Sequence, residues 1–158
     1  MNQFSCPEVA LHYEFITEAI DRIVETHEGL TTSELNRRPP APETNSVFLL
    51  AVHTIANARE AILQILGDKD VHRDRDAEFA AVADGTWLPS SDWPAQKQEL
   101  LSTMQQWTCE KLAETVEHPR RGPETAREVL LSTATHAREH TGHAELTRQL
   151  ILAARESS

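Results

Sequence analysis

The sequence contains little cysteine and no long apolar run. Its two cysteines, Cys6 and Cys109, are too few for a disulfide framework. We expect a reduced pair, with a single Cys6–Cys109 bridge as the alternative. No apolar stretch approaches the roughly 20 residues that a membrane-spanning helix needs. The N-terminal residues also lack the pattern of a signal peptide, so we expect a cytoplasmic protein.

Positive charge is scarce as well. Lysine and arginine number 15 against 25 aspartates and glutamates, which gives a formal net charge of −10. This balance argues against nucleic acid or an anionic membrane as a partner. The sequence has no Gly-rich phosphate loop, no G-x-S-x-G motif and no basic aromatic stretch. We expect a small-molecule substrate instead.

Helical periodicity dominates the 158 residues, a length that suits a single domain with its own core. The four segments with apolar residues at helical spacing are Pro7 to about Glu28, a stretch capped by Asn45 or Ser46 and ending at Gly67, Asp92 to about Val116, and Pro123 to about Ala154. No internal repeat or strand pattern is present. The sequence therefore predicts an all-α fold, a four-helix bundle with long connections that spans residues 1–158 as one domain.

The connection between the second and third predicted helices is about 26 residues long, too long for a plain bundle loop. Its tryptophans, Trp87 and Trp93, predict packing rather than disorder. Its acidic run, 68–76, lacks the glycine and glutamate of an EF-hand loop, so we interpret it as a solvated surface segment. An alternative is that this segment folds over the bundle as a lid and brings His72 to a metal.

Histidines give the strongest indication of chemistry. His136, His140 and His143 are three, four and seven positions apart, so they share one helix face, where two imidazoles can bind one ion. His53 interrupts an apolar stretch of the second predicted helix and must find a partner there. It is either a further ligand or a buried histidine with a hydrogen-bond acceptor. Spacing alone does not separate the pair 136/140 from the pair 140/143.

Three neutral imidazoles leave one coordination position open, the pattern of catalytic rather than structural zinc. Nickel and iron accept the same ligands. An ion held in this way lowers the pKa of bound water to about 7 or activates a thiolate.

Two stretches resemble the DinB-like superfamily of small bacterial metal-binding bundles. They are GLTTSELNRRPPAPETNSVFLLAVH and HAREHTGHAELTRQLI. The family pattern has one histidine in the second helix and H-x-x-x-H, or E-x-x-x-H, in the last long helix, followed by a glycine. The resemblance implies metal ligands at His53, His136 and His140, with Gly142 as the family glycine. It leaves His143 beside the site, orienting a ligand or a bound water.

The family includes thiol-dependent transferases and the metal-binding domain of mycothiol-dependent maleylpyruvate isomerases, which carry an additional C-terminal domain. The resemblance therefore implies a thiol-dependent transferase or isomerase whose divalent metal, zinc with nickel or iron as alternatives, activates a low-molecular-weight thiol. Two alternatives stay open. One is a hydrolase that uses metal-bound water, with Glu139 or Glu145 for proton transfer. The other is a non-catalytic metal-binding bundle of a stress response.

Other residues receive structural interpretations. We expect Cys109 to be buried, His12 and His27 to be structural, and His118 to lie at a helix end, where a cation offsets the helix dipole. Gly142, inside a helix at a cost near 1 kcal/mol, predicts the close approach of another backbone. Bundles of this size often pair through helix faces, so a homodimer is a further expectation.

Overall fold

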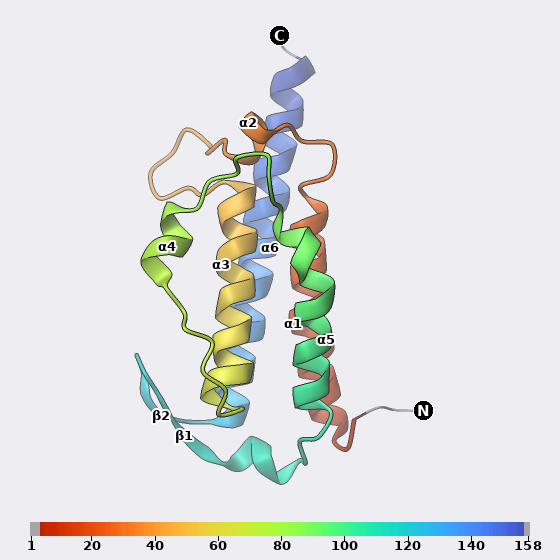
Figure 1. Ribbon diagram of the computed structural model, residues 1–158, viewed down its shortest axis with the longest axis vertical. Coiled ribbons are helices and arrows are strands. Elements are labelled where there is room, and N and C mark those ends of the chain that lie inside the picture. The colour runs from red at the N-terminus through yellow and green to blue at the C-terminus, as the bar shows by residue number, and fades with distance from the viewer. Residues whose placement is uncertain (1–3, 157–158) are drawn as a thin grey trace.

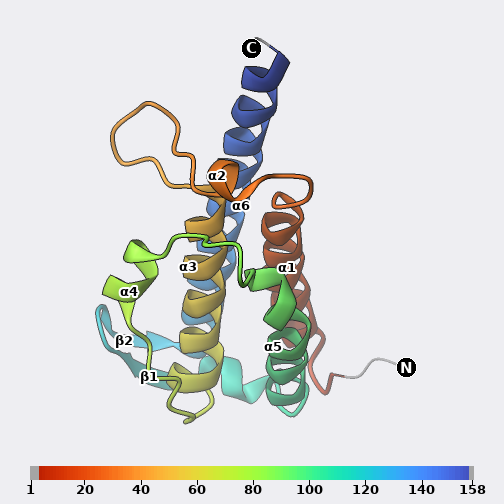
Figure 2. The same ribbon diagram turned by 45° about the horizontal axis from the view of Figure 1, so that its top comes forward.

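Four long helices run side by side along the long axis of the molecule (Figures 1 and 2). The structure is a computed structural model that describes residues 4–156. The helices are α1 (Pro7–Glu25), α3 (Val47–Arg59), α5 (Pro89–Met104) and α6 (Ala126–Glu156). The predicted all-α four-helix bundle is confirmed. Short helices α2 (Thr32–Leu35) and α4 (Arg75–Ala80) lie in the two long connections.

Helix α3 is the most deeply buried of the four long helices. Nine of its 13 residues are buried, as expected for a segment that is apolar around most of its circumference. It begins at Ser46, whose side chain accepts a hydrogen bond from the Leu49 amide at 3.2 Å. It continues into a π-helical turn, η1 (Glu60–Ile65), before Gly67. Apolar side chains of α1, α5 and α6 close the core around α3, among them Ile16, Ile20, Leu100, Met104 and Leu130.

The predicted third helix begins and ends too late, because α5 begins at Pro89 rather than at Asp92. Helix α5 ends at Met104, and a 3-10 turn, η2 (Glu110–Ala113), leads into an antiparallel hairpin of β1 (Thr115–His118) and β2 (Gly122–Thr125). Gly122, with a φ of +79°, supplies the left-handed backbone at the turn. At the other end of the hairpin the β-branched residues Thr115 and Thr125 pair with each other, and such residues favour strands. Consequently α6 begins at Ala126 rather than at Pro123. The expectation for His118 is also wrong, because it lies buried in β1.

The long connection after Gly67 is ordered on the bundle surface. Asp74 caps α4 by accepting from the Ala77 amide at 3.0 Å. Asp68, Asp70, Asp74 and Asp76 are exposed, so solvation is confirmed for the acidic residues of the run, whereas the side chain of Arg73 within it is buried. His72 is exposed and pairs with Asp70, so the alternative that brings it to a metal is wrong. Trp93 is buried at the start of α5, and its Nε1 donates to Asp21 of α1 at 2.8 Å.

The expectation of a reduced cysteine pair is wrong. Cys6 and Cys109 form a disulfide with their Cα atoms 5.2 Å apart. The chain after α5 returns to the end of the bundle where α1 begins, and this return brings together two residues that are 103 positions apart. Cys6 is fully buried, whereas Cys109 is exposed rather than buried as expected.

Gly142 does not mark a close backbone approach. A Cβ atom at this position would meet no heavy atom within 4 Å beyond its own helix and chain neighbours. The expectation of a packing role is therefore wrong. Among the described residues, no helix is both long enough and apolar enough to cross a membrane.

Candidate metal centre

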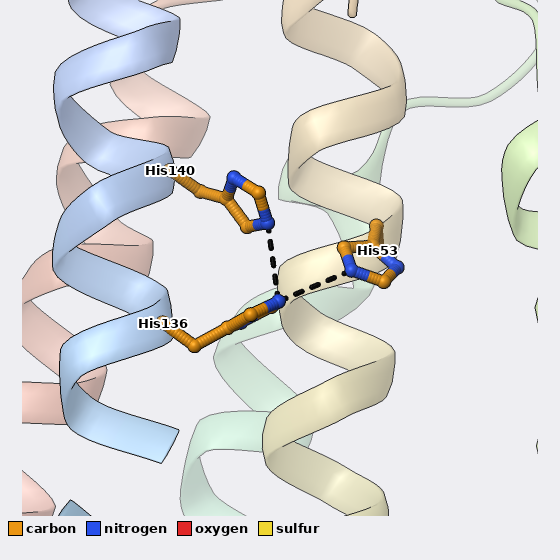
Figure 3. A group of neighbouring side chains, drawn as sticks. All are labelled: His53, His136 and His140. Carbon is orange, nitrogen blue, oxygen red and sulfur yellow. Dashed lines mark hydrogen bonds between the residues drawn. The ribbon is translucent and has the colours of Figure 1, made fainter. Parts of the chain in front are cut away.

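Three histidine side chains from two helices meet inside the bundle. His53 extends from α3, and His136 and His140 lie one turn apart on α6, all pointing toward a common point (Figure 3). The Nε2 of His136 is 3.2 Å from the Nε2 of His53 and 3.1 Å from that of His140. Each ring offers one nitrogen, and these nitrogens lie within 4.8 Å of one another. Thus two stretches more than 80 residues apart form one candidate site.

This spacing fits a metal ion. Zinc binds imidazole nitrogens at about 2.0–2.1 Å, and tetrahedral geometry then separates the nitrogens by about 3.4 Å. The two shorter separations in the site are within a few tenths of an ångström of that value. The third pair, His53 and His140, lies within 4.8 Å, so rotation of these side chains would have to close that separation for one ion to bind all three.

Proton placement also favours a cation at the centre. Nδ1 of His53 lies 2.8 Å from the Glu78 carboxylate, which can only accept a hydrogen, so the Nε2 of neutral His53 presents a lone pair. A hydrogen on the Nε2 of His136 can donate to both His53 and His140 only as one shared hydrogen bond, which is weaker than a bond to a single acceptor. A cation at the common point accepts all three lone pairs at once.

Burial keeps the two α6 imidazoles neutral. Burial, together with the charges of His140, His53, Arg73 and Arg75, lowers the pKa of His136 to about 3. Burial and the neighbouring histidines lower the pKa of His140 to about 4. Both rings are therefore neutral near pH 7, the form in which imidazole binds metals.

The Nδ1 atoms of His136 and His140 differ in their hydrogen bonding from the Nδ1 of His53, which has Glu78 as a partner. The Nδ1 atoms of His136 and His140 are buried and have no hydrogen-bond partner among the described residues. His136 lines a cavity of about 60 Å³ with polar neighbours that include Asn57, His118 and Thr133. A cavity of that size can hold a water molecule when its walls are polar.

Sequence reasoning did not identify Glu78 or Arg73, two buried charged residues of the long connection. The Nε of Arg73 donates to one oxygen of Glu78 at 2.6 Å, and its Nη2 donates to the other at 2.8 Å. Burial alone would raise the pKa of Glu78, but hydrogen bonds from Arg73 and His53 outweigh it and lower that pKa to about 2. No motif in the sequence marks these residues, because their burial depends on the path of the connection over α3.

An aromatic side chain covers the α4 side of His53. The ring of Phe79 lies 4.8 Å from the imidazole of His53, centroid to centroid, and is 42% exposed. The guanidinium of exposed Arg75 lies over the ring of Phe79, 5.6 Å from its centroid. The site therefore has an apolar wall with a cation at its solvent edge.

The remaining candidate residues lie around the three histidines. His143 is exposed, and its ring centroid is 5.7 Å from that of His140. Glu139 is exposed and lines a groove between α1 and α6. Glu145 accepts a hydrogen bond from Arg22 of α1 at 2.9 Å. Neither glutamate belongs to the convergent histidine group.

A helical bundle whose facing helices bring three histidines to one point belongs to the class of bundles that can hold a metal in their core. The DinB superfamily model matches residues 16–144, and the chain belongs to that family. The resemblance inferred from the two sequence stretches is confirmed.

Solved structures agree with this assignment. A conserved protein from Enterococcus faecalis is similar at 25% identity, with a TM-score of 0.74 over 91% of this chain and 96% of that one. A DinB-like protein from Bacillus cereus shares the fold at 19% identity, with a TM-score of 0.68 over 93% of each chain. No curated protein matches significantly.

Proposed function

We propose that this protein is a divalent-metal-dependent enzyme, a thiol-dependent transferase or isomerase, with His53, His136 and His140 as the metal ligands. The observation that carries the proposal is the approach of three Nε2 atoms to one point, with two separations of 3.1 and 3.2 Å. Neutral imidazoles favour zinc, and nickel or iron suit the same ligands. When bound, the ion supplies a Lewis-acid position that lowers the pKa of a coordinated thiol.

The thiol in this proposal is a small molecule. Both cysteines of the chain are joined in the disulfide, and Cys6 and Cys109 lie outside the histidine group. The protein therefore offers no thiol of its own to the site. Phe79 shields one side of His53 from water, and a drier site strengthens the interaction between a cation and a thiolate.

The positions of the carboxylates favour thiol chemistry over the hydrolase alternative. A metal-bound water acting as nucleophile needs a nearby base to take its proton. Glu78 is the carboxylate that touches a site histidine, but Arg73 and His53 occupy both of its oxygens. Glu139 lines a groove between α1 and α6, and Glu145 accepts a hydrogen bond from Arg22.

Removing ligands tests the metal site. We expect His53→Ala and His140→Ala each to abolish stoichiometric metal, measured by elemental analysis of the purified protein. Each substitution removes one of only three imidazole ligands. His72→Ala is the matched control, because His72 is exposed and pairs with Asp70 away from the site. Full metal occupancy in both site variants would refute the assignment.

Adding thiols tests the reaction class. We expect turnover of electrophilic substrates by the metal-loaded protein only when a low-molecular-weight thiol is supplied. Turnover without thiol would favour hydrolysis by metal-bound water. A metal-loaded protein that turns over neither class of substrate would favour the non-catalytic alternative.

A further inference from the structure

Glu78 is the one buried residue of helix α4. Its side chain is 6% exposed, whereas its neighbours Ala77, Phe79 and Ala80 are exposed. Apolar burial therefore does not explain why α4 presents this residue to the bundle. A buried carboxylate is costly unless it is paired and hydrogen-bonded, so its partners indicate its role.

The partners of Glu78 are a site histidine and an arginine. One oxygen accepts from the Nδ1 of His53 at 2.8 Å and from Arg73 at 2.8 Å, and the other oxygen accepts from Arg73 at 2.6 Å. The side chain of Arg73 is only 3% exposed. Such a fork of two parallel bonds fixes the plane of the carboxylate as well as its position.

The network continues away from the site. Arg73 also donates to Glu60 at 2.6 Å, and Glu60 accepts from Arg120 of the turn between β1 and β2 at 2.5 Å. Two carboxylates thus alternate with two guanidinium groups, and their formal charges cancel. Each charge in the network is balanced by an opposite charge beside it. Glu78 is thereby held in place by the connection between η1 and α5, which carries Arg73, and by the β1–β2 turn, which carries Arg120.

The bond to Glu78 determines which nitrogen of His53 can bind an ion. An imidazole whose Nδ1–H donates to a carboxylate has its lone pair on Nε2, and its ring can no longer rotate freely. The Nε2 of His53 is the atom that faces His136. The other two site histidines have no comparable protein partner among the described residues for their Nδ1 atoms.

We infer that Glu78 is a positioning residue of the candidate metal centre, fixing the ring and tautomer of His53 from the connection between η1 and α5, with Arg73, Glu60 and Arg120 holding its carboxylate. The metal-binding part of this inference rests on the proposed function. Partners of this kind typically contribute a factor of about 10–100 to metal affinity.

Metal titration of the full chain tests the inference. We expect Glu78→Ala and Glu78→Gln to weaken zinc binding by about 10–100-fold and about 10-fold, measured by competition with a chromophoric chelator. Glutamine has the size of glutamate and one acceptor oxygen, but it has no charge. Its amide nitrogen cannot accept a hydrogen bond, so one of the two bonds from Arg73 is lost. Glu99→Gln is the matched control, because Glu99 pairs with Arg59 and Lys69 away from the site. Circular dichroism verifies folding, and Glu78→Gln decides the test if the alanine variant does not fold.

Nitrogen-15 NMR of the histidine rings provides a readout that needs no metal. We expect the hydrogen of His53 on Nδ1 in the metal-free native protein and its redistribution toward Nε2 in Glu78→Ala. A native His53 with its hydrogen on Nε2, or folded Glu78 variants with native zinc affinity, would overturn the inference. If the native protein binds neither zinc, nickel nor iron, the proposed function fails, and the tautomer measurement still decides the role of Glu78.

Discussion

His53 is buried among apolar neighbours on α3, and both of its ring nitrogens face other side chains. The sequence left two interpretations of this residue open, a metal ligand or a histidine with a hydrogen-bond acceptor. The structure gives the ring an acceptor at Nδ1 and a convergent site at Nε2, so the two interpretations are compatible. An apolar helix interior accepts an imidazole only under such conditions.

Gly142 leads to a prediction about a single residue. We expect Gly142→Ala to raise the free energy of unfolding by up to about 1 kcal/mol, because alanine is the better helix former and nothing obstructs its methyl group. Chemical denaturation measures the change. A loss of stability would mean that the family glycine has a packing role that this structure does not contain.

Gly122 is the control for that substitution. Its φ of +79° lies in the left-handed region, which alanine adopts only at a cost. The same glycine-to-alanine change should therefore lower the stability of the protein here, opposite in sign to the effect at Gly142.

At the scale of elements, the starts of α1 and α3 were predicted, whereas α5 begins three residues before Asp92 and α6 three residues after Pro123. A hydroxyl or amide before an apolar stretch has a local effect on the first turn, and the cap of α3 was narrowed to Asn45 or Ser46 on that basis. The end of α5 has no comparable signal. Apolar residues recur past Met104, and Leu112 is buried after the helix has already ended. The spacing of apolar residues indicates which positions are buried, not whether they are helical. A turn that packs on the same core therefore continues the apolar spacing of the helix before it.

The α3 cap leads to the second prediction. We expect Ser46→Ala to lower the free energy of unfolding by about 1–2 kcal/mol, because the Leu49 amide loses its acceptor inside a buried helix start. Thermal and chemical unfolding measure the loss. Asn45→Ala is the control and should change stability by less than about 0.5 kcal/mol. Equal losses in the two variants would contradict the assignment of the cap to Ser46.

At the scale of the whole molecule, periodicity was sufficient for the bundle, whereas the choice of His136 and His140 over the pair 140/143 came from the resemblance to the DinB-like superfamily. Helical spacing placed His136 and His140 on one face, and the apolar surroundings of His53 placed it in the core. The Glu78–Arg73 pair was not predictable, because it depends on how a charged connection folds over a distant helix. The disulfide was not predictable for a similar reason, since two cysteines give no spacing pattern.

The disulfide gives the prediction at this scale. We expect Cys109→Ser, or reduction of the native protein, to lower the free energy of unfolding by about 2–4 kcal/mol, because a cross-link between residues 103 positions apart restricts the unfolded chain. Denaturant titration with and without reductant measures the effect. Ser102→Ala, an exposed position on α5, should respond to reductant like the native protein. An unchanged midpoint in reductant would show that the bond contributes nothing to stability.

The Cys6–Cys109 bond also divides the histidines between two topological parts of the chain. Residues 6 to 109 form a closed covalent ring that contains His53, and His136 and His140 lie on the linear tail that leaves it. A protease nick inside the ring, for instance in the connection that carries α4, yields one covalent molecule until a reductant opens it. A nick in the hairpin instead separates the two α6 histidines from His53 at once when the protein is denatured.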